Sequence, residues 1–220
     1  MRKYVMSTMM NTKTKTGTLT TCALMAAIMC ILCPMSLPIG PIPISLQIFV
    51  CLLATYILGT TRALISFMVY LFLGAVGLPV FSGFQGGLAK LAGPTGGYII
   101  GFIFTILIAG SIIDRFGRQG ELRPTKADNI PQFSSKDIRA EKMKIRRIIA
   151  AVIGMTLGIA AAYLFGTIWF IHQAQCDLSY ALSVCVIPFI PLDLMKMAAA
   201  IVLGTAIRKA LRRSDILIDK

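Results

Sequence analysis

An acid and a base stand three residues apart in a stretch that is otherwise apolar. Asp193 and Lys196 lie in PFIPLDLMKM, residues 188–197, together with Pro188 and Pro191. In a helix this i, i+3 spacing places both side chains on one face. A charge within a membrane costs about 3 kcal/mol, is normally paired and directed inward, and indicates a functional site. Two interpretations are open. The residues form a structural ion pair, or they belong to a binding site. In the second case each proline, which has no backbone N–H, leaves a carbonyl free to face the site.

The composition predicts that this stretch crosses a membrane. Hydrophobic residues make up 56% of the 220 residues and charged residues 14%, against about 25% charged in soluble domains. A membrane helix needs about 20 mostly apolar residues. The continuous apolar runs predict an all-α integral membrane protein. We expect six transmembrane helices, at about 18–35, 45–60, 63–78, 94–113, 148–171 and 179–207.

The charge distribution predicts how the helices are oriented. The net charge is +13, and 20 of the 22 basic residues lie in segments that six alternating spans place on one side. This positive-inside pattern predicts a multi-pass protein of the cytoplasmic membrane with both termini cytoplasmic. It favours contact with anionic lipid over nucleic-acid binding. The expected segments are a tail at 1–17, helices one to four with external lid loops at 18–113, a basic cytoplasmic loop at 114–147, helices five and six at 148–207, and a tail at 208–220.

Two loops on the opposite, outer side are apolar yet rich in Gly and Pro, at 34–44 and 77–97. Irregular backbone at membrane depth is tolerated where it is buried in protein or lines a cavity. We therefore expect a lid over an externally open pocket, with ordinary turns as the alternative. At 1.5 Å per residue, Asp193 lies about 22 Å from the inner boundary at Arg208, in the outer half of the membrane. The other unusual residues collect on the same side: Gln47, Lys90, the segment 81–84 and the segment 93–98.

Other chemistries find little support in the residue types. The single histidine, His172, and the lack of a nucleophile–base pair predict a protein that is not an enzyme. GFQGGLAK, residues 83–90, departs from a phosphate-binding loop, so the chain cannot hydrolyse ATP by itself. We expect no metal and no cofactor, and the six cysteines suit apolar packing. Ala23 and Ala27 form a small-x-x-x-small face that another helix can approach closely, within the bundle or on a partner.

Four segments in this order resemble the BioY family, the biotin-specific substrate-binding (S) components of energy-coupling-factor (ECF) transporters. They are GPIPISLQ (40–47), YLFLGAVGLPVFSGFQGG (70–87), GPTGGYIIGF (93–102) and FIPLDLMK (189–196). The resemblance implies a six-helix S-component fold and high-affinity biotin uptake. It also implies a partner ECF module, made of a transmembrane coupling subunit and two ATPase subunits, that docks at Ala23 and Ala27.

The resemblance suggests roles for eight residues. Asp193 would accept a ureido N–H of biotin, and Lys196 would donate to the ureido carbonyl or balance Asp193. Lys90 would meet the ligand's carboxylate. Polar contacts would come from Gln47 and Thr95, and apolar walls from Phe81, Phe84 and Tyr98. The alternatives are an S component for riboflavin, thiamine or lipoate, a stand-alone biotin facilitator, a small intramembrane enzyme, or a structural membrane subunit.

Overall fold

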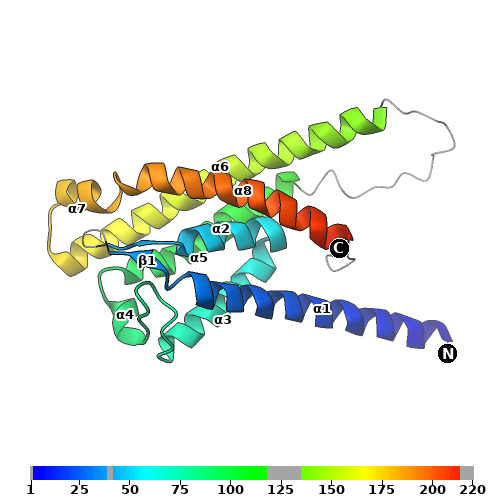
Figure 1. The fold of residues 1–220 in the computed structure, drawn as a ribbon, viewed down its shortest axis with the longest axis horizontal. Coiled ribbons are helices and arrows are strands. Elements are labelled where there is room, and N and C mark those ends of the chain that lie inside the picture. Colours follow the sequence, from blue (N-terminus) through cyan, green and yellow to red (C-terminus); the bar gives the residue numbers. More distant parts are fainter. Residues whose placement is uncertain (1, 39–41, 118–134, 214–220) are drawn as a thin grey trace.

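The protein is a bundle of apolar helices with loops and short elements at one end (Figure 1). A computed structural model describes the backbone of residues 2–38, 42–117 and 135–213, and the side chains of 16–38, 42–116 and 145–211. The bundle helices are α1 (Arg2–Leu32), α2 (Gln47–Leu58), α3 (Thr60–Ala75), α5 (Gly96–Ile112), α6 (Ser135–Ala174) and α8 (Phe189–Arg213). One π-helical turn, Ile113–Gly117, extends α5.

The first five expected spans each correspond to one of these helices, and the sixth includes most of α8. Among the residues that the structure describes, three apolar segments are long enough to cross a membrane: Gly96–Phe116, Ile145–Ala174 and Phe189–Leu211. Three others are apolar but shorter: Thr16–Leu32, Gln47–Leu58 and Thr60–Ala75. The 12 residues of α2 rise about 18 Å, well short of a hydrocarbon core about 30 Å thick.

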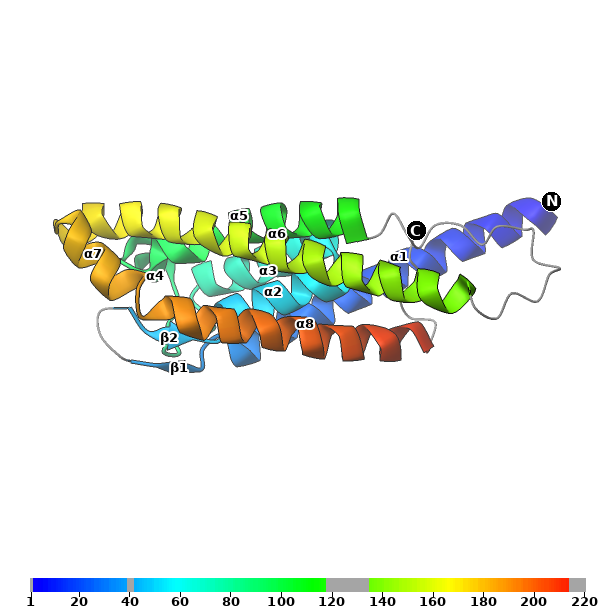
Figure 2. The same ribbon diagram turned by 90° about the horizontal axis from the view of Figure 1, so that it is seen from above.

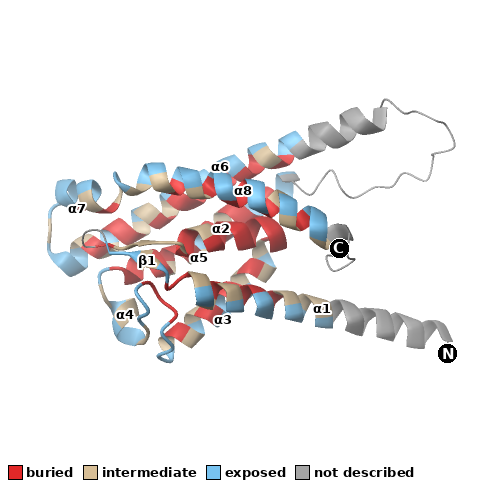
Figure 3. Ribbon diagram, in the orientation of Figure 1, coloured by how far each residue is buried: buried red, intermediate tan, exposed pale blue. Residues whose placement is uncertain are grey.

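Helix α2 can be short because other helices surround it. All of its residues except Phe49 are buried, and it packs against α1, α3, α5 and α8. Figure 3 shows it as the continuously buried helix of the bundle. Gly59, with φ 80°, then turns the chain directly into α3, because glycine adopts positive φ without steric cost. The centre of the bundle is therefore a protein core that lipid does not reach.

The predicted sixth span, 179–207, is wrong as a single helix. The chain forms α7 (Leu178–Cys185), a turn, and then α8 from Phe189. Pro188 has no N–H to continue the helix and disfavours helical backbone at the residue before it. Helix α7 packs against α6 at the end of the bundle that carries α4 and the strands (Figure 2). Asp193 therefore lies within the first two turns of α8.

The two outer loops contain more regular structure than an all-α prediction foresees. In the first, β1 (Ser36–Leu37) pairs antiparallel with β2 (Ile44–Ser45), and Ser36 lies opposite Ser45. The second contains α4 (Leu88–Ala92) and a bridge between Phe81 and Gln85. The N–H of Gly83 donates to the carbonyl of Pro34 at 3.0 Å, so the loops are joined by a backbone hydrogen bond.

The opposite end of the bundle carries the start of α1 and the end of α8 (Figures 1 and 2). Helix α1 begins at Arg2, so the expected N-terminal tail is helical, and α6 begins at Ser135 within the expected basic loop. Residues 118–134 and 214–220, the rest of that loop and of the C-terminal tail, lie outside the described residues. The cytoplasmic placement of this end stays a prediction.

Two buried arginines hold the last carbonyls of α2. Arg147 of α6 donates to the carbonyl of Tyr56 at 3.3 Å, and its guanidinium lies 5.0 Å from the centre of the Tyr56 ring. Arg208 of α8 donates to the carbonyls of Tyr56 and Ile57 at 3.4 and 3.1 Å. Carbonyls at a helix C-terminus have no partner within the helix and favour cations. The two arginines therefore tie α2 to both long helices.

Candidate binding site

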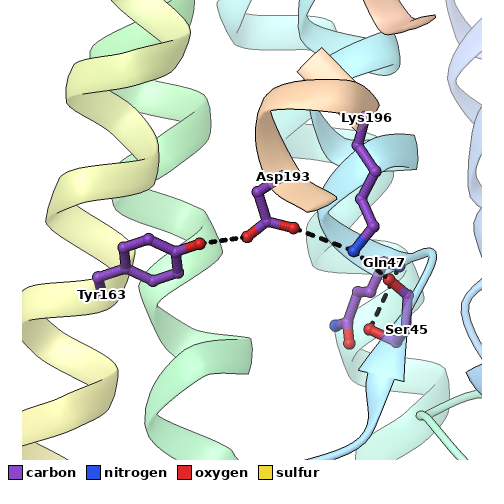
Figure 4. Close-up of polar contacts among 5 residues, drawn as sticks. All are labelled: Ser45, Gln47, Tyr163, Asp193 and Lys196. Atoms are coloured by element: carbon purple, nitrogen blue, oxygen red, sulfur yellow. Dashed lines mark hydrogen bonds and ion pairs between the residues drawn. The ribbon is translucent and has the colours of Figure 1, made fainter. Parts of the chain in front are cut away.

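Asp193 has both of its carboxylate oxygens engaged although it lies within a membrane-spanning helix. Lys196 donates to Oδ1 at 3.0 Å, as the i, i+3 spacing predicts, and the hydroxyl of Tyr163 on α6 donates to Oδ2 at 2.6 Å. The residue is 4% exposed. Figure 4 shows the carboxylate between the tyrosine and the lysine. Such charge-assisted hydrogen bonds offset part of the cost of burying the ion.

Lys196 extends this row of contacts to the first outer loop. Its ammonium also donates to the backbone carbonyl of Ser45, in β2, at 2.9 Å. Tyr163, Asp193, Lys196 and Ser45 thus form one chain of hydrogen bonds across α6, α8 and the β1–β2 hairpin. The lysine supplies three N–H donors, and these two contacts use two of them.

Gln47, the first residue of α2, brings an unused donor to the same place. The residue is 2% exposed, and its Nε2 has no hydrogen-bond partner among the residues that the structure describes. Figure 4 shows Gln47 beside Ser45 and Lys196. A buried polar group without a partner costs about 1–3 kcal/mol. A ligand carrying a hydrogen-bond acceptor would recover part of that free energy.

These polar residues line a small cavity of about 50 Å³. Its other walls are mainly apolar and come from α2, α5, α6, α7, α8 and both outer loops. The polar lining is Ser45, Gln47, Ser82, Thr95, Tyr98, Tyr163, Asp193 and Lys196, and the largest apolar lining residues are Ile42, Ile48, Ile99, Phe102 and Phe189. Mostly apolar walls with a few placed polar groups are typical of a site for a small organic molecule.

Five of the eight residues predicted for the site line this cavity: Gln47, Thr95, Tyr98, Asp193 and Lys196. Tyr98 is held in place by its hydroxyl, which hydrogen-bonds with that of Thr167 at 3.0 Å. Its ring lies against Gly166, where an added Cβ would come within 2.4 Å of it. The close approach of α5 and α6 therefore fixes this wall.

Phe81 and Phe84 are not among the residues that line the cavity. Phe81 is fully buried behind the loop, with its ring edge-on to Tyr70 at 5.7 Å between ring centroids. Phe84 has φ 55° and is 68% exposed. The bridge from Phe81 to Gln85 closes a tight turn, which directs these side chains away from the cavity and places Ser82 in its wall.

Lys90 lies in a separate hollow of the second outer loop. The hollow shares Pro43 and Thr95 with the cavity. Desolvation lowers the pKa of Lys90 from its ordinary value. The predicted carboxylate-binding residue is therefore next to the cavity, not within its wall.

The sequence analysis missed Tyr163 and Ser45, which complete the polar row. A tyrosine in a membrane span was a usable signal, because a buried phenol requires a hydrogen-bond partner. Ser45 contributes a backbone carbonyl, for which residue type carries no signal. No group of three or more potential metal ligands occurs in the described part of the chain.

The small-residue face of α1 points partly outward. Ala23 and Ala27 are exposed, whereas Ala26 between them is buried in the bundle. The exposed neighbours Leu24 and Ile31 are apolar. This face is available to lipid or to another membrane helix.

The bundle of apolar helices encloses a cavity near one end, and the walls of this cavity are mostly apolar with a few placed polar groups. These features define a small integral membrane protein that binds a solute. The chain belongs to the BioY family, whose model matches residues 6–213. It is 32% identical to a probable biotin transporter BioY of Pyrococcus horikoshii, over 83% of this chain and 90% of that protein. It is also 32% identical to the biotin transporter BioY2 of Lactococcus lactis, over 92% and 96%.

A solved structure shares the fold as well as the sequence similarity. The crystal structure of an S component for biotin from an ECF-type ABC transporter superposes with a TM-score of 0.69 at 30% identity. The match covers 89% of this chain and 92% of that one.

Proposed function

We propose that this protein is the biotin-binding S component of an ECF transporter and takes up biotin across the cytoplasmic membrane. The observation that carries the proposal is the hydrogen-bonded row Tyr163–Asp193–Lys196–Ser45, in which Asp193 is buried, with the unpartnered amide of Gln47 beside it. The names of the relatives and of the matching structure support biotin as the ligand. The protein acts as a transporter subunit and not as an enzyme.

Biotin presents the groups that this row can bind. Its ureido ring has two N–H donors and one carbonyl acceptor. Asp193 accepts from a ureido N–H, since a carboxylate has about four lone-pair positions and two are in use. Lys196 or the free amide of Gln47 donates to the ureido carbonyl, and Thr95 adds a further polar contact.

The rest of the ligand is apolar except at its end. The ring of Tyr98, with Phe102 and Phe189, packs on the thiophane body. The acyl chain then runs toward Thr95, and its carboxylate approaches Lys90. The cavity of about 50 Å³ is smaller than biotin, so the outer loops must move apart when the ligand binds.

Transport requires a partner that supplies energy, because the sequence contains no phosphate-binding loop. We propose a transmembrane coupling subunit with two ATPase subunits. The coupling subunit docks on the exposed face of α1 at Ala23 and Ala27, where small side chains allow helix axes to approach closely. Both termini then lie on the cytoplasmic side, as the positive-inside rule predicts.

Direct binding is the decisive measurement. Radiolabelled biotin should bind the purified protein in detergent, and unlabelled biotin should displace it whereas riboflavin, thiamine and lipoate should not. Asp193→Asn should abolish or strongly weaken binding, and Asp177→Asn, at the exposed cap of α7, is the matched control. Unchanged affinity in Asp193→Asn would show that the site is assigned incorrectly, and displacement by another vitamin would change the substrate.

Uptake separates the S component from a stand-alone facilitator. Vesicles containing the protein and its partner subunits should accumulate biotin only with ATP inside. Equal rates without the partner subunits would refute the proposed dependence on an ECF module.

A further inference from the structure

The hollow around Lys90 is large and open, and it adjoins the cavity at Pro43 and Thr95. Its volume is about 520 Å³ against about 50 Å³ for the cavity. It is lined by Gln85, Gly86, Ala89, Lys90, Gly93 and Pro94, and by the two shared residues Pro43 and Thr95. Because Thr95 lines both spaces, a molecule whose head is seated among Gln47, Asp193 and Lys196 would reach the hollow past Thr95 once the outer loops move apart.

The hollow has a cationic group that the folded chain leaves available. Lys90 is half-buried, and no carboxylate forms an ion pair with its ammonium within the described part of the chain. By contrast, the ammonium of Lys196 is already paired with Asp193. An ammonium that has lost part of its hydration gains from an anion placed beside it. The chemistry of the hollow is thus suited to an anionic tail.

The size of the hollow exceeds what the acyl chain of biotin alone would occupy. We propose that it is an outer subsite for anionic tails, so that the protein binds amides of biotin that carry a carboxylate beyond the acyl chain, in addition to biotin. Gln85 and Thr95 can hydrogen-bond the added amide, and Lys90 binds the terminal carboxylate. The inference rests on the proposed function, because it needs the biotin head group in the cavity.

Competition binding with matched ligands tests the subsite. Radiolabelled biotin bound to the purified wild type is displaced by biotin, by biotinyl-6-aminohexanoate, or by the neutral N-hexyl amide of biotin, which has a tail of similar length. We expect the extended acid to bind within about tenfold of biotin and about fivefold more tightly than the neutral amide, the effect of one partly exposed ion pair.

Two variants and one control locate the effect. Lys90→Gln should remove the preference for the acid over the neutral amide. Ala89→Trp fills the hollow and should weaken the extended acid at least tenfold more than it weakens biotin. Ala92→Trp, on the same short helix but outside the hollow, should leave the affinity of both ligands unchanged.

The results separate this inference from the proposed function. If biotin binds but the extended acid competes no better than the neutral amide, or if Ala89→Trp leaves the extended acid unaffected, the outer subsite is refuted and biotin binding stands. If the wild type does not bind biotin at all, the proposed function fails and the subsite with it.

Discussion

The hydroxyl of Tyr163 on α6 donates a 2.6 Å hydrogen bond to the carboxylate of Asp193 on α8. This contact joins two membrane-spanning helices and leaves the other carboxylate oxygen to Lys196. Tyr163→Phe removes the donor with little change in shape. We expect about tenfold weaker biotin binding, which corresponds to about 1.4 kcal/mol for a hydrogen bond to a charged group. Titration in detergent checks this, with Tyr180→Phe, at an exposed tyrosine, as the control. Equal affinities in wild type and Tyr163→Phe would contradict a role in orienting Asp193.

Substitutions of Asp193 and Lys196 should have strongly non-additive effects on the free energy of unfolding. Lys196→Met leaves a buried carboxylate without its cation and should lower the free energy of unfolding by about 3 kcal/mol. The double variant Asp193→Asn/Lys196→Met removes both charges and should recover most of that loss. Thermal unfolding in detergent measures both. A double variant as unstable as the sum of the single variants would mean that the two charges act independently.

Substituting an arginine that contacts the end of α2 should lower the stability of the fold and leave the affinity for biotin unchanged. Arg208 is buried and donates to two carbonyls of α2, so Arg208→Met should lower the free energy of unfolding by about 2 kcal/mol. Biotin affinity should stay within twofold, because Lys196 lies about 18 Å away along α8. Lys209→Met, at the exposed neighbouring position, is the control. A large loss of affinity in Arg208→Met would indicate coupling between the two ends of the bundle.

Gly166 should be required for the shape of the cavity. A Cβ there would lie 2.4 Å from the ring of Tyr98, so Gly166→Ala must displace this wall and should weaken biotin binding more than tenfold. Gly74→Ala meets the ring of Phe81 at 2.2 Å, outside the cavity, and should lower the melting temperature with a smaller change in affinity. The same loss of affinity in both variants would point to general misfolding.

The exposed face of α1 should affect transport and not binding. Ala27→Trp places a large side chain where the coupling subunit is proposed to dock, and should abolish ATP-dependent uptake while detergent-solubilised protein binds biotin normally. Val202→Trp, on an exposed position of α8, controls for a bulky group facing lipid. Full uptake by the Ala27→Trp transporter would exclude this docking face.

The sequence alone determined the class of structure and one essential pair. Long apolar runs predict helices because every backbone polar group must be satisfied within the membrane, and the i, i+3 spacing predicts the contact between Asp193 and Lys196. Both are local properties of the chain. Gln47, Thr95 and Tyr98 could be placed near this pair because apolar runs and topology indicate which end of each helix faces outward.

The tertiary structure decided the contacts between distant segments. Lys196 and Ser45 are separated by 151 positions, and Tyr163 and Asp193 by 30, so these hydrogen bonds depend on how the helices pack. The directions of Phe81 and Phe84 depend on one tight turn, since adjacent loop residues can face opposite ways. Hydropathy and spacing report what one segment prefers, whereas the walls of a cavity come from several segments, and only their packing determines which side chains meet.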